Sequence, residues 1–129
     1  MHRATTTDPA YRNGDWGPAY LIQGPSSDIG VLRLGPGQAM TNHYHAACDE
    51  SFVVIEGQAS LWLDGTTRVD LGPDAVVRCE PGEMHYLVND TAADFRCVFI
   101  KSPASPGDTH NVPWVPGEPA PQRPTDTPA

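Results

Sequence analysis

Two histidines and a glutamate are spaced in this chain so that they could hold a metal ion. A single residue separates His43 from His45, so on a β-strand both side chains project to the same face. Glu50 precedes the apolar run Ser51–Glu56, which can return antiparallel beside the histidine strand. Two imidazoles and one carboxylate form a ligand face that suits iron and related divalent metals.

A third histidine could complete this group. His85 follows the turn Pro81-Gly82 and begins a further apolar run, Tyr86–Val88. We expect it to reach the same ion from the opposite wall of the fold. Cys48 lies within the segment that carries the first ligands, and we expect a reduced structural thiol there, although it could approach the metal.

Short apolar runs separated by turn residues predict an all-β chain. The 129 residues include 12 glycines and 14 prolines, and turn pairs such as Asp64-Gly65 indicate tight hairpins. No run keeps a helical period over ten or more positions. Such runs predict an antiparallel barrel or sandwich; they are Ala19–Gln23, Gly30–Leu34, Ser51–Glu56, Ser60–Leu63, Ala75–Cys79, His85–Val88 and Phe95–Ile100.

Composition divides the chain into three parts. Residues 1–14 are polar and predicted to be flexible, and residues 15–102 hold the expected barrel. Residues 103–129 form a proline-rich tail, of which we expect residues 121–129 to be disordered. Residues 112–115 are apolar enough to pack against the barrel or a neighbouring subunit.

Charge and composition exclude several classes of partner. Eight basic residues against 16 acidic ones give a formal net charge of −8, which disfavours nucleic acid. No stretch approaches the roughly 20 apolar residues of a membrane helix. The three cysteines lack a Cys-x-x-Cys spacing and the first ten residues lack an apolar segment, so we expect a reduced, cytoplasmic protein.

The ligand segment resembles the first sequence motif of the cupin family at every defined position. Gly37 is followed after five residues by His43, then by His45, then after four residues by Glu50, and after six more by Gly57. Five fixed residues at the family's offsets, within a chain that already reads as all-β, make this resemblance specific.

A second segment resembles the second cupin motif less closely. Pro81-Gly82 is followed after two residues by His85, and Asn89 follows after three more. The family pattern places its proline two residues before that glycine, where this chain has Glu80. The glycine that opens the motif is also displaced, with Gly72-Pro73-Asp74 at the turn. These departures concern turn geometry and leave the ligand position intact.

The resemblance, which covers roughly residues 30–100, implies a cupin-type antiparallel β-barrel, also called a double-stranded β-helix or jelly roll. It makes His43, His45, Glu50 and His85 the ligands of one divalent metal ion. Fe(II) is favoured, and Mn(II), Ni(II) and Zn(II) also occur in such sites. The resemblance further implies a homodimer and a small-molecule substrate.

Strand alternation suggests which residues bind the substrate. Phe52 and Val54 share the face of Glu50, and His85 similarly brings Leu87 and Asn89, although Asn89 is as readily a turn residue. An arginine side chain inside a small barrel usually binds an anionic ligand, but arginines that face outward are more common. The expected substrate-binding residues are Met40, Phe52, Val54, Leu87, Arg33 and Arg78, with Tyr20, Trp62 and Arg96 as further candidates.

Three functions fit this site. The first is an Fe(II)-dependent dioxygenase, which we favour narrowly because an apolar pocket without an obvious general base suits O₂ chemistry. The second is a non-redox isomerase, cyclase, dehydratase or lyase, in which the metal stabilises an enolate; a cupin polyketide cyclase would fit the size. Cupin lyases of dimethylsulfoniopropionate carry a tyrosine where this chain has Phe52, which disfavours a lyase. The third is a non-catalytic binding module.

Overall fold

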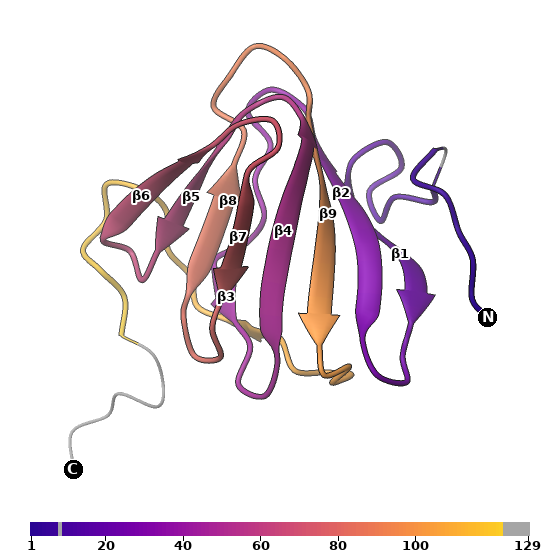
Figure 1. Cartoon of the computed structure of the whole chain (residues 1–129). Helices are drawn as coiled ribbons and strands as arrows, with labels where there is room; N and C mark the ends of the chain where they lie inside the picture. Colours follow the sequence, from indigo (N-terminus) through magenta and orange to yellow (C-terminus); the bar gives the residue numbers. More distant parts are fainter. Residues whose placement is uncertain (8, 123–129) are drawn as a thin grey trace.

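Every regular element in the described part of the chain is a β-strand. The computed structural model describes residues 1–7 and 9–122, and it contains ten strands within them (Figure 1). All seven apolar runs overlap a strand, which confirms the predicted all-β class. No helix in the described residues is long and apolar enough to span a membrane.

The strands form two antiparallel sheets of five strands each. The first sheet has the order β1-β2-β9-β4-β7, and its strands are β1 (Gly17–Gln23), β2 (Asp28–Leu34), β9 (Phe95–Ser102), β4 (Asp49–Glu56) and β7 (Val76–Cys79). The second has the order β10-β3-β8-β5-β6, and its strands are β10 (His110–Asn111), β3 (His43–Tyr44), β8 (His85–Val88), β5 (Ala59–Leu63) and β6 (Thr67–Leu71).

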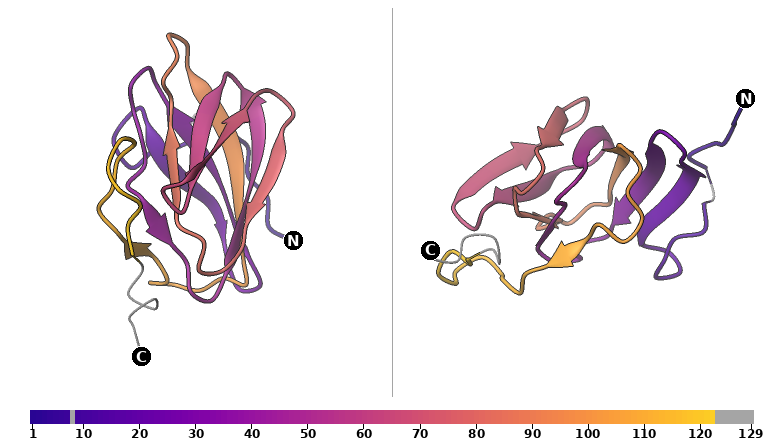
Figure 2. Two further views of the ribbon diagram at one scale, coloured as in Figure 1. Left: turned by 90° about the vertical axis from the view of Figure 1, so that its left-hand side faces the viewer. Right: turned by 90° about the horizontal axis from the view of Figure 1, so that it is seen from below.

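The two sheets face each other and enclose one apolar core (Figure 2). Alternation along β9 illustrates how the sequence builds it: Phe95, Cys97 and Phe99 are buried, whereas the residues between them are less so. The largest fully buried side chains include those of Phe95, Leu34 and Leu61. This is the cupin-type double-stranded β-helix that the resemblance implies.

The strand that carries Glu50 lies in a different sheet from the one we expected. β4 pairs with β7 and β9, not with the histidine strand β3. The histidine strand pairs instead with β8, which carries His85. Alternation determines which face a residue occupies, but it does not determine which strands pair. The sequence therefore led us to expect Glu50 beside the histidine strand and His85 on the opposite wall, whereas the structure has them the other way round.

The proline-rich tail contributes to the second sheet. β10 pairs with β3, and its register sets His110 against Tyr44. Beyond it Val112 and Trp114 are buried, and the Trp114 ring contacts Trp62 of β5 at 5.9 Å between centroids. The tail therefore covers part of this sheet. The predicted disorder of residues 121–129 falls mainly on residues 123–129, which lie outside the described residues.

The turn before β7 explains one departure from the cupin motif. Asp74 has a φ of 71°, in the left-handed region, whereas Gly72 has no positive φ. Aspartate tolerates this conformation better than most residues with a Cβ. The aspartate therefore adopts at this turn the conformation that favours glycine.

Candidate metal centre

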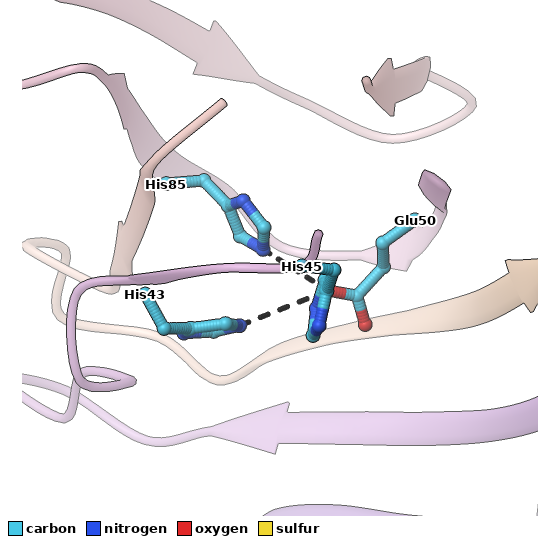
Figure 3. A group of neighbouring side chains, drawn as sticks. All are labelled: His43, His45, Glu50 and His85. Atoms are coloured by element: carbon cyan, nitrogen blue, oxygen red, sulfur yellow. Dashed lines mark hydrogen bonds and ion pairs between the residues drawn. The ribbon is translucent and has the colours of Figure 1, made fainter. Parts of the chain in front are cut away.

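The four expected ligands converge between the two sheets (Figure 3). His43 of β3 and His85 of β8 are cross-strand partners in the second sheet. His45 follows β3 directly, and Glu50 projects from β4 in the first sheet. One carboxylate from one sheet thus meets three imidazoles that belong to, or directly follow, strands of the other.

The ligand atoms lie close enough to share one ion. Glu50 Oε1 is 3.0 Å from His45 Nε2, 3.1 Å from His85 Nε2 and 3.9 Å from His43 Nε2. One ligand atom from each of the four residues lies within 4.8 Å of the others. Glu50, His45 and His85 are buried, and the His43 side chain is only 12% exposed.

Backbone carbonyls orient the three imidazoles. The Nδ1 atoms of His43, His45 and His85 lie 2.6, 2.7 and 3.1 Å from the carbonyl oxygens of Thr41, Asp108 and Glu83. A carbonyl oxygen can only accept, so Nδ1 carries the proton and each Nε2 presents a lone pair toward Glu50. Such outer hydrogen bonds are the usual partners of metal-binding histidines.

This arrangement fits a divalent metal. In neutral imidazoles protonated at Nδ1, three Nε2 lone pairs face a carboxylate that is itself only an acceptor. Burial lowers the pKa of the His43 imidazole, which favours the neutral form that binds metals. Four converging electron-pair donors without a proton between them are satisfied by a cation.

Asp108 in the tail holds the loop between the ligands. Its carboxylate accepts hydrogen bonds from the backbone amides of Ala46, Ala47 and Cys48, at 2.9, 2.8 and 3.2 Å. Burial opposes the Asp108 charge, but these amides and His110 outweigh it and lower the pKa to about 2. Asp108 thus fixes the segment from His45 to Glu50 with both its carboxylate and its carbonyl. Sequence reasoning missed this role.

A second group, His45, Cys48 and Asp108, also brings three ligand atoms together, but it serves a structural purpose. The Asp108 oxygens already bind backbone amides, and His45 Nδ1 binds a carbonyl. Burial, reinforced by Asp108, raises the pKa of the Cys48 thiol to about 11, so it stays protonated. Cys48 therefore behaves as the structural thiol that the sequence favoured.

A cavity of about 290 Å³ opens onto the metal centre, and three ligands, His43, Glu50 and His85, line it. Met40, Phe52 and Leu87, which we expected to bind substrate, also line it, as does Tyr20. Their role in substrate binding stays a prediction. The remaining lining residues are Arg12, Pro18, Leu32, Thr41, Phe99, Lys101, Thr109 and Asn111.

The other expected substrate-binding residues lie outside this cavity. Val54 is buried in the core, farther along β4 than Phe52. Arg33 is paired with Asp94 at 2.6 Å on the exposed surface, and Arg78 donates to Ser51 on the outer face of the first sheet. Both arginines alternate with inward-facing residues, so their side chains point away from the interior.

Asn89 and two of the three further candidates, Trp62 and Arg96, also lie outside the cavity and make structural contacts. Asn89 is fully buried and donates to the carbonyls of Leu34 and Ala93, both at 2.8 Å. It is therefore a turn residue, the alternative left open by the sequence. Arg96 is paired with Glu56, and Trp62 packs against the tail.

Lys101 is the cavity residue that sequence reasoning missed. It is the cross-strand partner of Glu50, and directly opposed residues share a face of the sheet. The signal was available, because Phe95, Cys97, Phe99 and Lys101 alternate along β9. The predicted apolar run ends at Ile100, directly before Lys101, whereas the strand continues to Ser102.

The fold and the site define a small β-barrel protein with one candidate metal centre between its sheets. The family model for the cupin domain matches residues 30–101. The match covers more than half of the chain, so the chain belongs to the cupin family.

Two curated relatives are proteins of polyketide synthesis. The tetracenomycin polyketide synthase protein TcmJ of Streptomyces glaucescens is 30% identical over 102 residues, which cover 76% of this chain and 68% of that protein. The polyketide synthase protein CurC of Streptomyces cyaneus is 31% identical over 81 residues, 63% of this chain and 52% of that protein. The chain thus spans about half the length of CurC.

Solved structures share the fold. A double-stranded β-helix protein of Klebsiella pneumoniae superposes with a TM-score of 0.73 at 22% identity, covering 83% of this chain and 95% of that one. The polyketide cyclase RemF of Streptomyces resistomycificus gives 0.71 at 21% identity, covering 89% and 87%. At these identities the likeness concerns the fold alone.

Proposed function

We propose that this chain is a metal-dependent enzyme that closes a ring in a small polycarbonyl substrate without redox chemistry, as a polyketide cyclase does. The observation that carries the proposal is the convergence of His43, His45, Glu50 and His85 beside a cavity that three of them line. The relatives TcmJ and CurC are named for polyketide synthesis, and the fold neighbour RemF is named a polyketide cyclase. These names support the cyclase alternative over the oxygenase that the sequence favoured.

The metal ligands and the cavity walls have different roles in this proposal. A divalent ion held by the four ligands would supply Lewis acidity, which stabilises negative charge on a carbonyl oxygen. Phe52, Leu87 and Phe99 form apolar walls that exclude water and favour a folded, compact substrate. Ring closure requires the two reacting carbons to be held close together, and a rigid small cavity does this by restricting the substrate's conformations.

One observation favours an Fe(II) oxygenase as a second candidate. The three histidines and one carboxylate of this site include the two-histidine, one-carboxylate face that non-haem iron uses. The preference for this function depended on a cavity without polar groups able to assist proton transfer. Tyr20, Lys101 and Thr109 line the cavity, so it does contain polar groups that could assist proton transfer.

Anaerobic product analysis separates the two candidates. The protein loaded with Fe(II), Mn(II), Ni(II) or Zn(II) is mixed with a linear aryl-capped triketone, and cyclised products are followed by liquid chromatography and mass spectrometry. The proposal predicts faster cyclisation, or a single dominant ring product, without O₂ and with a non-redox metal. O₂ uptake with an oxygenated product, seen only with iron, would instead establish the oxygenase.

A matched pair of variants ties the result to the site. His45→Ala removes a ligand, whereas Arg33→Met removes a charge on the outer surface, away from the cavity. Cyclisation and metal content should fall together in the first variant and stay unchanged in the second. Equal cyclisation by both variants would show that the reaction does not depend on the metal centre.

A further inference from the structure

Lys101 is the only lysine in a chain of net charge −8, and it lies in the cavity of the metal centre. Its position follows from the sheet, since it is the direct cross-strand partner of the ligand Glu50 on the inner face. The ammonium donates one hydrogen bond, 2.7 Å long, to the Tyr20 hydroxyl. Among the described residues it forms no ion pair with a carboxylate, although the chain has 16 acidic residues.

The surrounding rings hold this lysine in place. Its Nζ lies 5.3 Å from the centroid of the Tyr20 ring and 5.9 Å from that of Phe99. These two rings pack edge to face at 5.2 Å. Gly30 lies between them in the sheet, and a Cβ there would come within 2.2 Å of the Phe99 ring. The absence of a side chain at Gly30 therefore lets the Phe99 ring approach, so that both rings lie against the ammonium.

The hydrogen bond also orients the tyrosine. An ammonium can only donate, so the Tyr20 oxygen is the acceptor and its own O–H remains a donor. The described residues offer that proton no acceptor. Tyr20 and Lys101 line both the metal-centre cavity and a neighbouring pocket, so the pair lies between them. Two polar donors are thus available side by side at an otherwise largely apolar wall.

The negative charge of Glu50 does not explain why a lysine lies in this cavity. The three imidazoles are neutral when they bind a metal, so a divalent ion with one carboxylate leaves a surplus positive charge. Lys101 adds to that surplus, and Arg12 also lines the cavity. Glu50 is the only carboxylate among the lining residues. The loaded cavity is therefore positive inside a strongly acidic protein.

From these observations we infer that Lys101 and Tyr20 form an anchor for an anionic oxygen group of the ligand. The ligand class is a small, mainly apolar acid whose carboxylate or enolate oxygen binds this pair while its body contacts Phe52, Leu87 and Phe99. The inference rests on the proposed function only in taking this cavity as the substrate site. Its test measures binding alone, so either idea can fail without the other.

The test compares benzenesulfonate with methyl phenyl sulfone on the metal-loaded protein. The two probes have nearly the same shape, but only the first is an anion, and a sulfonate is a weak metal ligand. Reductive methylation with ¹³C-formaldehyde labels the single lysine and retains its charge, and the N-terminal signal is identified because it persists in Lys101→Met. Benzenesulfonate should shift the Lys101 dimethyl resonance, and the sulfone should not.

Affinities of the variants decide the outcome. The wild type should bind benzenesulfonate about tenfold or more tightly than the sulfone, as expected for a hydrogen bond to a charged group. Lys101→Met should abolish this preference, Lys101→Arg should keep most of it, and Tyr20→Phe should reduce it a few-fold. Arg33→Met, which removes a positive charge outside the cavity, should leave it unchanged. Equal metal content in all variants shows that the centre is intact.

Two results would overturn the inference. One is equal affinity of the wild type for the two probes. The other is a preference for benzenesulfonate that survives in Lys101→Met, because the anion would then be bound elsewhere. Neither result bears on cyclisation by the loaded protein, which the triketone assay measures separately.

Discussion

The two ends of the barrel interior are built by the same strands and serve different purposes. At one end of β9 the inward residues Phe95 and Cys97 are fully buried in the core. At the other end the inward residues Phe99 and Lys101 line the cavity, where the Phe99 ring forms the edge of the same core. β4 shows the same division, with Val54 in the core and Glu50 at the candidate metal centre.

This difference shows that alternation alone does not separate core from site. The two ends differ in the types of their inward-facing residues. These are apolar at the core end and include histidine, glutamate, lysine and tyrosine at the cavity end. A continuous strand connects the two, so the packed end can hold the backbone of the other end rigidly in place. Rigid elements are better supports for a metal centre than loops are.

The strongest test of this division compares two phenylalanines on one face of β9. Phe95→Ala should lower the free energy of unfolding by about 3–5 kcal/mol, because it leaves a cavity in a closed core. Phe99→Ala should cost less, about 2 kcal/mol, because its ring already borders an open cavity. Urea unfolding of the metal-free variants measures both. Equal losses would mean that the cavity end is packed as tightly as the core.

The next effect concerns the metal. His45→Ala removes one of four ligands and should weaken metal binding by more than about a hundredfold, beyond what loss of an outer hydrogen bond typically costs. The reason is that His45 supplies one of the three buried imidazole donors, and its loss leaves the ion with three protein ligands in place of four. Metal analysis after dialysis against a weak chelator measures it. Full stoichiometry in this variant would contradict the metal centre, and Phe95→Ala serves as the control that should retain its metal once folded.

Most of the strands could be predicted because local pattern determines them. Apolar runs and turn residues located seven of the ten strands in the described residues, and the histidine spacing together with the motif resemblance located the four residues that converge in the candidate metal centre. Strands with few buried residues were missed: β6 has only Leu71 buried, and β10 has only two residues, both exposed. Such strands form through pairing with neighbours, which a local pattern does not reveal.

The parts that failed depend on contacts between distant segments. The pairing of β3 with β8, and not with β4, is decided by the whole sheet. Alternation could have placed Arg33 outside, since its neighbours Leu32 and Leu34 are both buried. Asp108 carries no local signal of its contacts 60 residues and more away. The homodimer and the identity of the metal stay predictions.

Asp108 offers a test of how the tail supports the cavity end. Asp108→Ala removes the acceptor of three backbone amides in the ligand loop and should weaken metal binding about 10–100-fold. Asp108→Asn keeps one carbonyl acceptor and should lose less. Competition with a coloured chelator gives the affinities.

The control for Asp108 is Asp94→Ala, since Asp94 pairs with Arg33 on the exposed surface and should leave metal affinity unchanged. Wild-type affinity in Asp108→Ala would mean that the ligand loop is held by its own residues, independently of the tail.

The smallest effect distinguishes the turns at the two ends. Asp64 and Asp74 are the two residues other than glycine with positive φ in the described chain, at 51° and 71°. Asp74, in the turn at the core end, makes no side-chain hydrogen bond among the described residues, so Asp74→Gly should relieve backbone strain and stabilise the fold by about 0.5 kcal/mol. Asp64, at the cavity end, accepts a 2.9 Å hydrogen bond from the Met84 amide, directly before His85.

Asp64→Gly relieves similar strain but loses that hydrogen bond, so it should be destabilising, by about 1 kcal/mol or less. Thermal unfolding of the two variants beside the wild type gives the comparison. A gain in stability for Asp74→Gly with a loss for Asp64→Gly indicates that the aspartate at the cavity end is held there for its side chain. Stabilisation by both changes would contradict this, since the Asp64 carboxylate would then contribute nothing to the position of the strand that carries His85.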